Sequence, residues 1–323
     1  MVRSIASVQE TVQKELAQVE ATLAAVTHAE IPRVREMLEH VLSAGGKRMR
    51  PTISLLAGRF GDYKPELLVP MAASIELLHT ATLVHDDVID DSDTRRGRPT
   101  TNSRQHNAVA VMLGDYMFAH AAELICRTES IEVVKLFSRT LMAMASGELT
   151  QDMSAYQYGQ DTMQYFHRIA GKTASLFATA AEGGALVARA PEDIVAAMHD
   201  YGENVGMAFQ IVDDILDFEG TEEELGKPTG SDLMQGTLTL PAILLMERHP
   251  DDNPVEKLFR DRGREEHLAE AIFMIQDSDI LDETYAVARD FRDRAVAALE
   301  PLPDTPDRAA LAEIAAQVIE RRS

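Results

Sequence analysis

The sequence predicts an all-α fold in one domain spanning residues 1–323. Three observations predict this fold class. Apolar residues recur at three- and four-residue spacing over long stretches, which is the pattern of amphipathic helices. Alternating runs rich in Val, Ile and Thr are nearly absent, and so are the Asn-Gly and Asp-Gly pairs typical of hairpins. With 45% hydrophobic and 26% charged residues, the chain has a globular composition and the length for a sizeable core.

Gly and Pro residues divide these stretches into separate helices. The expected helices are 7–27, 31–43, 68–90, 104–123, 130–153, 161–187, 191–219 and 282–299. The breakers are Gly45-Gly46, Gly61-Asp62, Gly97-Arg98-Pro99, Pro191, Gly220, Pro250 and Pro301-Leu302-Pro303. Pro- and Asp-rich residues 249–254 and 300–307 are candidate linkers, but they are too short, and the segments after them too small, to define a second domain.

Composition excludes several classes of protein. The net charge of −22 argues against a nucleic-acid partner, because binding phosphate backbones needs a basic surface. The first 20 residues lack the apolar core of a signal peptide, and no run approaches 18 uninterrupted apolar residues. We therefore expect a cytoplasmic protein with no integral membrane segment. The single cysteine, Cys126, rules out an intramolecular disulfide and is expected to be a small buried apolar residue.

Two aspartate clusters of identical form lie within predicted helices. They are Asp86-Asp87-Val88-Ile89-Asp90 and Asp213-Asp214-Ile215-Leu216-Asp217. The first and last carboxylates of each cluster stand at i and i+4, so they are neighbours on one helix face and destabilise the bare helix. Mg²⁺ suits such hard oxygen ligands and completes its coordination with water and substrate phosphate.

A single acidic cluster in this acidic chain has an equally good interpretation as a solvated helix face. Two clusters are harder to explain that way, because apolar residues precede both of them: Leu83 and Val84 the first, Phe209 and Ile211 the second. Apolar flanks favour a cavity wall, where unpaired carboxylates would be costly. The sequence therefore predicts a divalent-metal site.

Basic residues are concentrated in two short segments, 47–50 and 95–98. Arg forks onto phosphate oxygens and Lys acts as a point charge, so both segments are candidate anion sites. The alternative is that Arg95 and Arg96 simply pair with Asp90, Asp91 or Asp93. Together with the carboxylates, the cations predict a site large enough for a polyphosphate.

Three other motifs support weaker interpretations. Gly171-Lys172-Thr173 is not a P-loop, because Phe166 stands where the first glycine is needed and no strand precedes it. A Lys and Thr pair that binds diphosphate fits better. His79 lies seven residues before Asp86 on nearly the same helix face, although such a histidine is more often a packed core residue. Glu76 and His79 match one half of a di-iron motif, but the second half is missing.

These residues resemble the all-trans polyprenyl diphosphate synthases. The resemblance runs from residue 45 to about 241, and it implies a helical prenyltransferase bundle around a deep central cavity, usually a homodimer. It rests on five motifs in order, each weak alone: Gly45-Gly46-Lys47-Arg48-Met49-Arg50-Pro51; His85-Asp86-Asp87-Val88-Ile89-Asp90 with Arg95-Arg96-Gly97; Gly171-Lys172-Thr173; Gly206-Met207-Ala208-Phe209-Gln210 continuing to Asp217; and Gly226-Lys227-Pro228-Thr229-Gly230-Ser231-Asp232-Leu233.

The resemblance also implies roles for individual residues. Asp86, Asp90 and Asp213 would bind Mg²⁺, with Asp87, Asp214 and Asp217 in support. Isopentenyl diphosphate would be held by Lys47, Arg50, His79 and Arg96. The allylic diphosphate would be held by Arg95, Lys172, Thr173, Gln210 and Lys227. One departure is Thr237, which stands where many relatives have a Lys that contacts the leaving diphosphate.

The implied reaction is ionisation of the allylic diphosphate followed by attack of isopentenyl diphosphate on the cation. The released diphosphate is the expected base, and an apolar cavity keeps water from the cation. Ala81 and Thr82 stand where short-product relatives place an aromatic residue. The first cluster also lacks the two-residue insertion of bacterial short-chain enzymes. Both features imply a medium or long product of roughly six to ten isoprene units. Deeper floor candidates are Ser74, Leu77, Leu78, Met112 and Phe137.

Three alternatives remain beside this interpretation. A terpene cyclase shares the first aspartate motif, but its second metal motif carries Asn, Ser and Glu. An inactive regulatory subunit of a heteromeric synthase would be expected to have lost aspartates, yet all six are present. A short-chain farnesyl or geranylgeranyl diphosphate synthase is the closest rival. The sequence leaves open the product length, the primer, the downstream quinone or carrier lipid, and the need for a second subunit.

Overall fold

The computed structural model describes residues 5–95, 97–219, 229–261 and 264–320. Two compact units make up the chain, and each draws on three separate segments. Unit 1 contains Met1–Thr140, Leu176–Gly202 and Ala298–Ile314. Unit 2 contains Leu141–Ser175, Glu203–Ala297 and Ala315–Ser323. Neither unit is a contiguous stretch of sequence, and the expectation of one domain stays a prediction.

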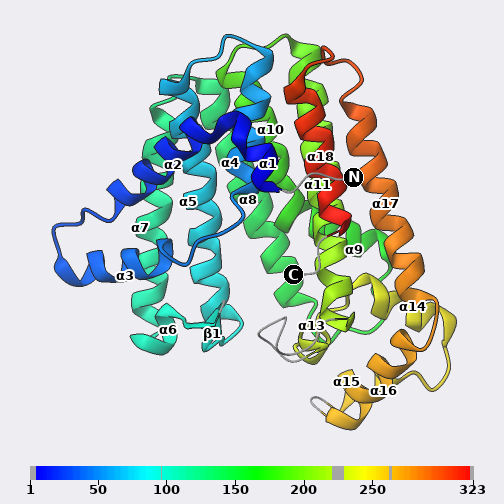
Figure 1. The fold of residues 1–323 in the computed structure, drawn as a ribbon. Coiled ribbons are helices and arrows are strands. Elements are labelled where there is room, and N and C mark those ends of the chain that lie inside the picture. The colour runs from blue at the N-terminus through cyan, green and yellow to red at the C-terminus, as the bar shows by residue number, and fades with distance from the viewer. Residues whose placement is uncertain (1–4, 96, 220–228, 262–263, 321–323) are drawn as a thin grey trace. The chain divides into compact units, whose positions relative to one another are not determined.

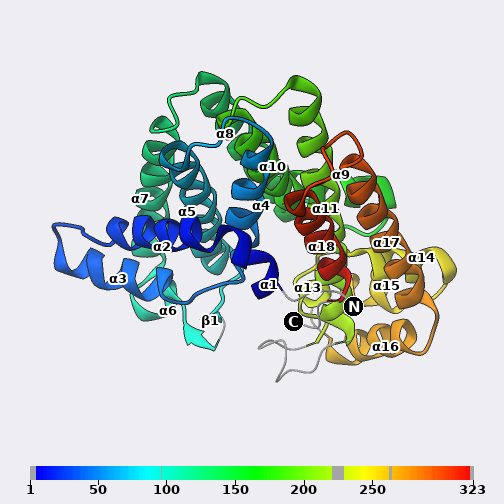
Figure 2. The same ribbon diagram turned by 45° about the horizontal axis from the view of Figure 1, so that its top comes forward.

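Unit 1 is organised around helix α5 (Pro65–Ile89), which runs beside α7 (Asn107–Cys126) in both views (Figures 1 and 2). Pro65 starts α5 at a position where the missing N–H is not needed. Apolar residues surround most of its length, so α5 is buried nearly all round. The hydroxyl of Ser74 donates a 2.7 Å hydrogen bond to the carbonyl of Ala121, which ties the middle of α5 to α7.

Shorter helices complete unit 1, together with the parts of longer helices that fall within its residues. The helices wholly inside it are α1 (Ile5–Gln9), α2 (Gln13–Val26), α3 (Pro32–Leu42), α4 (Met49–Ala57) and α6 (Thr101–Arg104), with 3₁₀ turns at Glu10–Val12 and Gly58–Phe60. Helices shared with unit 2 are α8 (Ile131–Met153), α10 (Ser175–Val187), α11 (Glu192–Glu219) and α18 (Pro306–Glu320).

Unit 2 has its own apolar core, in which the second half of α11 packs with α14 (Leu240–Arg248) and α16 (Glu265–Gln276). Ile211, Ile215 and Phe218 of α11 are fully buried there. The remaining elements of unit 2 are α9 (Thr162–Ile169), a π turn at Ala170–Ala174, α13 (Ser231–Met234), α14 (Leu240–Arg248), α15 (Pro254–Arg260), α16 (Glu265–Gln276) and α17 (Ile280–Ala298).

Each predicted helix lies in a helical region, with ends shifted by a few residues, but two of them are interrupted. The 3₁₀ turn at Glu10–Val12 divides the predicted helix 7–27, and the π turn at Ala170–Ala174 divides the predicted helix 161–187. Among the described residues, the sequence interpretation missed six further helices, α4, α13, α14, α15, α16 and α18, and all but the last residue of α6. It also missed a small antiparallel hairpin, in which β1 (Thr94–Arg95) pairs with β2 (Arg98–Pro99). Strands of two residues are too short to show a period of two, so no alternation could have predicted them.

Cys126 was predicted to be buried, and this prediction is wrong. Its side chain is exposed at the last residue of α7. The cysteine ends the helix instead of facing the apolar side that packs on α5.

Among the described helices, α5 and α7 are long and apolar enough to cross a membrane by length and composition, although neither is an uninterrupted apolar run. In α5, 67% of the most apolar window is buried inside the protein, as expected of a core helix. In α7 only 39% of that window is buried. Helix α7 therefore carries more exposed apolar surface than its place beside α5 explains.

Candidate functional site

The first aspartate cluster lies at the C-terminal end of α5. Asp86 and Asp90 are half-buried, and the N–H of Asp90 donates to the carbonyl of Asp86 at 2.8 Å. Helix α5 ends at this point, because Asp91 adopts a left-handed conformation with φ of 49°. The negative end of the helix dipole lies at a C-terminus, so carboxylates there are unfavourable without a cation. Position as well as spacing thus favours a bound metal.

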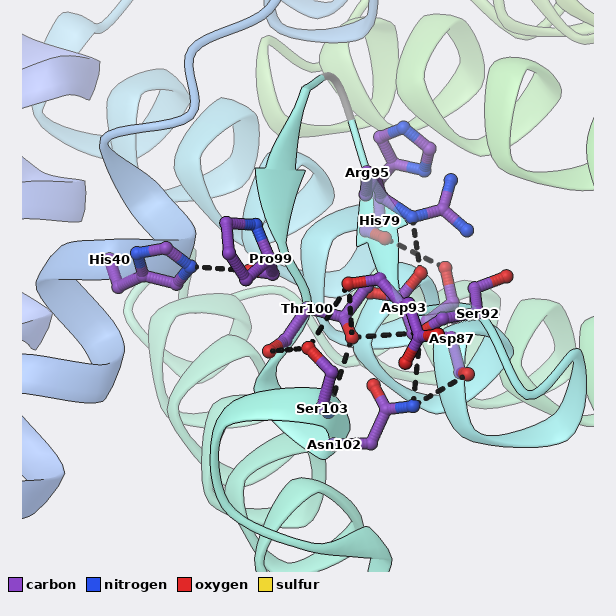
Figure 3. Close-up of polar contacts among 11 residues, drawn as sticks. His40, His79, Asp87, Ser92, Asp93, Arg95, Pro99, Thr100, Asn102 and Ser103 are labelled. Atoms are coloured by element: carbon purple, nitrogen blue, oxygen red, sulfur yellow. Dashed lines mark hydrogen bonds and ion pairs between the residues drawn. The ribbon is translucent and has the colours of Figure 1, made fainter. Parts of the chain in front are cut away.

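Asp87, between these two residues, is buried and has a different role. Its Oδ1 accepts from Nε of Arg95 at 2.5 Å, and its backbone carbonyl accepts from Ser92 and Asn102 (Figure 3). Burial raises the pKa of the Asp87 carboxyl, and the Arg95 charge and hydrogen bond oppose the rise. Asp87 therefore anchors the β1–β2 hairpin to the end of α5. Arg95 therefore does pair with an aspartate, but its partner is Asp87. The partners considered from the sequence were Asp90, Asp91 and Asp93.

A pocket that is partly open to solvent lies beside this cluster in unit 1. His79, Asp87 and Arg95 line it, so three predicted site residues come together. Arg48 and Arg98, from the two basic segments predicted to bind anions, also line the pocket, as does Glu76. The sequence interpretation missed His40, a further polar residue of the lining. His40 lies beside β2, and its Nε2 is 2.8 Å from the carbonyl oxygen of Pro99 (Figure 3).

Two cations predicted to hold isopentenyl diphosphate do not line this pocket. The Arg50 side chain is buried, and its guanidinium lies 4.1 Å from the ring centroid of Phe177. Lys47 is exposed before α4, and its carbonyl accepts from Gln9. Arg96 lies outside the described residues. The roles of all three stay predictions.

Arg48 and Glu76 form a partly buried ion pair that explains the half-matched di-iron motif. One guanidinium nitrogen of Arg48 lies 2.6 Å from Glu76, and Nε lies 2.5 Å from Glu20. Arg48 adopts a left-handed backbone with φ of 49°, which is uncommon for a residue with a side chain. Glu76 is thus the partner of an arginine that holds the start of α4.

The second aspartate cluster lies in the last two turns of α11, in unit 2. Asp213 is exposed, whereas Asp214 is 2% exposed. Tyr165 donates to Oδ2 of Asp214 at 2.7 Å, and Gln210 donates to Oδ1 at 2.9 Å. Burial raises the pKa of Asp214 to about 7, the charge of Asp232 adds to the rise, and the two hydrogen bonds oppose it. The buried carboxylate of Asp214 therefore connects α11 to Tyr165.

Asp217 is also buried and fixes the segment that follows α11. Its carboxylate accepts from the hydroxyl of Ser231 at 3.0 Å and from the N–H of Asp232 at 3.3 Å. Its carbonyl accepts from the N–H of Gly230 at 2.8 Å. These bonds place the start of α13 against the end of α11. Lys227, predicted to hold the allylic diphosphate, lies outside the described residues.

Lys172 and Thr173 lie in the π turn between α9 and α10. π turns occur often at functional sites. Nζ of Lys172 lies 2.6 Å from Glu148, a residue that the sequence interpretation missed. A Cβ on Gly147 would lie 2.7 Å from the backbone nitrogen of Lys172. Glycine at this position therefore lets α8 approach the π turn closely. Thr173 donates to Gln210 at 2.7 Å, which links the turn to Asp214 through the Gln210 side chain.

The two aspartate clusters have the same arrangement of accessible and buried carboxylates. Each has a first carboxylate that solvent can reach, Asp86 or Asp213, and a second that is buried and hydrogen-bonded, Asp87 or Asp214. Within the described residues, no three His, Cys, Asp or Glu side chains gather into a metal site. Asp86 and Asp90 nevertheless fit Mg²⁺, which typically takes one or two protein carboxylates and fills its octahedron with water and phosphate oxygens.

The chain is similar to known proteins in both sequence and structure. A model of the polyprenyl synthetase family matches residues 31–275. Heptaprenyl diphosphate synthase component 2 of Geobacillus stearothermophilus is 41% identical over 310 residues, covering 95% of this chain and 96% of that protein. Octaprenyl diphosphate synthase of Escherichia coli is 34% identical over 320 residues, covering 98% and 99%. The crystal structure of a polyprenyl synthase from Caulobacter crescentus, complexed with calcium and isoprenyl diphosphate, superposes with a TM-score of 0.95 at 34% identity, covering 100% and 99%.

An all-α fold with these aspartate-bearing helices and these relatives defines a prenyltransferase. Within that class, the chain belongs to the polyprenyl synthetase family, among the medium- and long-chain polyprenyl diphosphate synthases. The family resemblance and the helical fold expected from the sequence are both confirmed.

Proposed function

We propose that the protein condenses isopentenyl diphosphate with an allylic diphosphate to make a medium- or long-chain all-trans polyprenyl diphosphate. The observation that carries this proposal is the matched pair of aspartate clusters. Each ends a long helix, presents a reachable carboxylate and holds a second one in buried hydrogen bonds. The names of the relatives support a product of medium or long chain.

We propose Mg²⁺ as the cofactor, with Asp86, Asp90 and Asp213 as its protein ligands. When bound, the metal would neutralise the diphosphate and stabilise it as a leaving group. Asp87, Asp214 and Asp217 support these ligands by fixing the ends of α5 and α11. The related structure with calcium and isoprenyl diphosphate shows a divalent cation in that protein, and it supports a divalent site here.

The cations of the site would bind and orient the two diphosphates. Arg95 and Lys172 are each held by a carboxylate, Asp87 and Glu148, so their positions are set before substrate arrives. We assign the allylic diphosphate to Arg95, Lys172, Thr173, Gln210 and Lys227, and isopentenyl diphosphate to Lys47, Arg50, His79 and Arg96.

In the reaction, the allylic carbon–oxygen bond breaks and the diphosphate leaves with the electron pair. The double bond of isopentenyl diphosphate then forms the new carbon–carbon bond to the allylic cation. The released diphosphate accepts the proton that is lost, and apolar residues exclude water from the cation.

Product length would depend on the face of α5 that meets α7. Ser74 and His85 both contact α7, and Ala81 lies seven residues after the first and four before the second, so it shares their face. Ala81 is fully buried there, and Thr82 is half-buried with its hydroxyl bonded to the carbonyl of His79. Among the deeper candidates, Ser74, Leu77, Leu78 and Phe137 are buried, whereas Met112 is 60% exposed on α7.

We expect Ala81→Phe to shorten the product by one or more isoprene units, because a phenyl ring would fill space between α5 and α7. Overpacking a core position typically costs about 1–3 kcal/mol of folding free energy, so the variant should remain folded. Chromatographic sizing of dephosphorylated products measures the change, and Ala81→Val is the milder control. An unchanged product length with Phe would refute this role for Ala81.

We also propose that the protein is a homodimer that acts in the cytoplasm, with α7 at the subunit interface. Val111, Met112 and Tyr116 are exposed on this helix. Exposed apolar patches of this kind mark interaction sites on proteins. A relative named as component 2 of a synthase makes a second, different subunit the alternative.

Sedimentation of the purified chain tests the dimer. We expect the mass of two chains for the wild type and dissociation for Met112→Asp, because a charge at an apolar interface is left unpaired. Glu123→Gln, also exposed on α7, is the control and should leave the mass unchanged. A monomeric wild type would overturn the homodimer.

The activity itself is tested by incubating the purified protein with Mg²⁺, farnesyl diphosphate and labelled isopentenyl diphosphate. We expect a ladder that ends at a product of roughly six to ten isoprene units. A stop at three or four units with varied primers would favour the short-chain synthase. No incorporation at all would favour either a synthase that needs a second subunit or an inactive regulatory subunit, and mixing with candidate partner chains would come next.

A further inference from the structure

His85 directly precedes the first aspartate cluster, and the proposed reaction leaves it without a role. Its side chain does not join the carboxylates. The ring reaches across to α7, where Nε2 lies 2.9 Å from the carbonyl oxygen of Val111. Because a carbonyl can only accept a hydrogen bond, Nε2 carries the proton in this contact.

Four residues of α7 form a slot for the imidazole: Val111, Gly114, Asp115 and Phe118. The ring of Phe118 meets His85 edge to face, with centroids 5.1 Å apart. Oδ1 of Asp115 lies 3.6 Å from Nε2. A Cβ on Gly114 would lie 2.2 Å from Nε2, so only glycine admits the ring at this depth. The slot therefore accommodates the His85 ring against α7.

Because His85 directly precedes Asp86, its contact with Val111 of α7 affects the orientation of the proposed metal ligands. Residues along a helix are separated by about 100° of rotation, so fixing His85 fixes the direction of the neighbouring Asp86. Asp90 follows one turn later at the end of α5, beyond which the backbone turns at Asp91. A second polar contact between α5 and α7, from Ser74, lies about three turns earlier, so it controls the end of α5 less directly.

We infer that His85 is a positioning residue, which holds the last turn of α5 against α7 so that Asp86 and Asp90 are aligned for a divalent cation. This inference rests on the proposed function of those two aspartates. Residues that orient metal ligands typically change metal affinity or activity by about 10- to 100-fold when they are replaced.

The experiment compares His85→Ala and His85→Gln with the wild type. Gln keeps an N–H donor near the position of Nε2, and Ala does not. We expect Ala to raise the dissociation constant for Mn²⁺, read from the electron paramagnetic resonance of free Mn²⁺ with inorganic diphosphate present, by about 10-fold or more. The Mg²⁺ concentration that gives half-maximal turnover should rise in parallel, while KM for isopentenyl diphosphate stays unchanged. Gln should recover most of the loss.

Gly114→Ala tests the slot from the other helix. Alone, it should reproduce the His85→Ala defect, because its methyl group occupies the place of the imidazole. Combined with His85→Ala it should add little, since the clash is then gone, and this non-additivity identifies a direct interaction. His199→Ala, which removes a histidine paired with Glu182, is the matched control and should leave Mn²⁺ affinity unchanged.

Three results are decisive. Wild-type Mn²⁺ affinity in folded His85→Ala and Gly114→Ala would overturn the positioning role. Equal loss with Ala and Gln, or a rise in KM for isopentenyl diphosphate without a change in Mn²⁺ affinity, would also overturn it. If the wild type binds Mn²⁺ but transfers no prenyl group, the proposed function fails while the Mn²⁺ titrations still decide the role of His85.

Discussion

Replacing Asp86 with Asn is expected to lower kcat by about 10²- to 10³-fold, the loss typical of removing one group that stabilises developing charge. Asn keeps the shape of the side chain but removes the charge that would hold the metal. The fold should survive, because Asp86 is half-buried on the surface side of α5 and the buried Asp87 is untouched. Turnover at saturating Mg²⁺ with a circular dichroism spectrum measures both effects.

Asp93→Asn is the matched control for this change. Asp93 is an exposed carboxylate seven residues after Asp86, and its backbone carbonyl is the acceptor for Thr100 and Ser103 (Figure 3). We expect near-normal turnover in this variant. Near-normal turnover in Asp86→Asn as well, relative to an active wild type, would refute the assignment of Asp86 as a metal ligand.

Arg48→Ala should reduce the free energy of unfolding by about 3–5 kcal/mol, because it leaves the carboxylate of Glu76 buried without its cation. The exposed fractions of the two side chains are 14% and 8%, so water can do little to replace the lost partner. A loss of this size is a large part of the roughly 5–15 kcal/mol that stabilises a typical domain. Urea denaturation of wild type and variant measures the difference.

Two comparisons show whether burial is the cause. Arg127→Ala breaks an ion pair with Glu123 whose partners are both exposed, and it should cost less than about 0.5 kcal/mol. Arg48→Met combined with Glu76→Leu removes both charges and should regain much of the lost stability. If Arg48→Ala alone changed stability no more than Arg127→Ala, the Arg48–Glu76 pair would not be buried in solution.

The helices that were not predicted show which elements the spacing of apolar residues fails to reveal. Helix α14 was not predicted, and α15 and α18 begin inside residues 249–254 and 300–307, which were interpreted as candidate linkers. Yet Pro241, Pro254 and Pro306 lie in the first turn of these helices, where proline is favoured because the first N–H groups have no intrahelical partner. Attention to proline as a start signal would have found them.

Local sequence patterns were enough to predict the helical class, the long helices α5 and α11, and the residue types of the site. Apolar spacing, helix termini and carboxylate spacing are all properties of neighbouring residues, so they can be read along the chain. The five ordered motifs were likewise enough to identify the family, because each motif is a short local pattern whose order along the chain is part of the sequence.

Tertiary packing was needed to show which carboxylates are reachable and which are buried. Asp86 and Asp87 are adjacent in sequence, and nothing local tells that one meets solvent while the other meets Arg95. The partners of Asp214, Lys172 and His85 come from other helices, 49, 24 and 26 residues away. Such pairs depend on how helices pack, and packing is set by the contacts of the whole core, so no local pattern can reveal them.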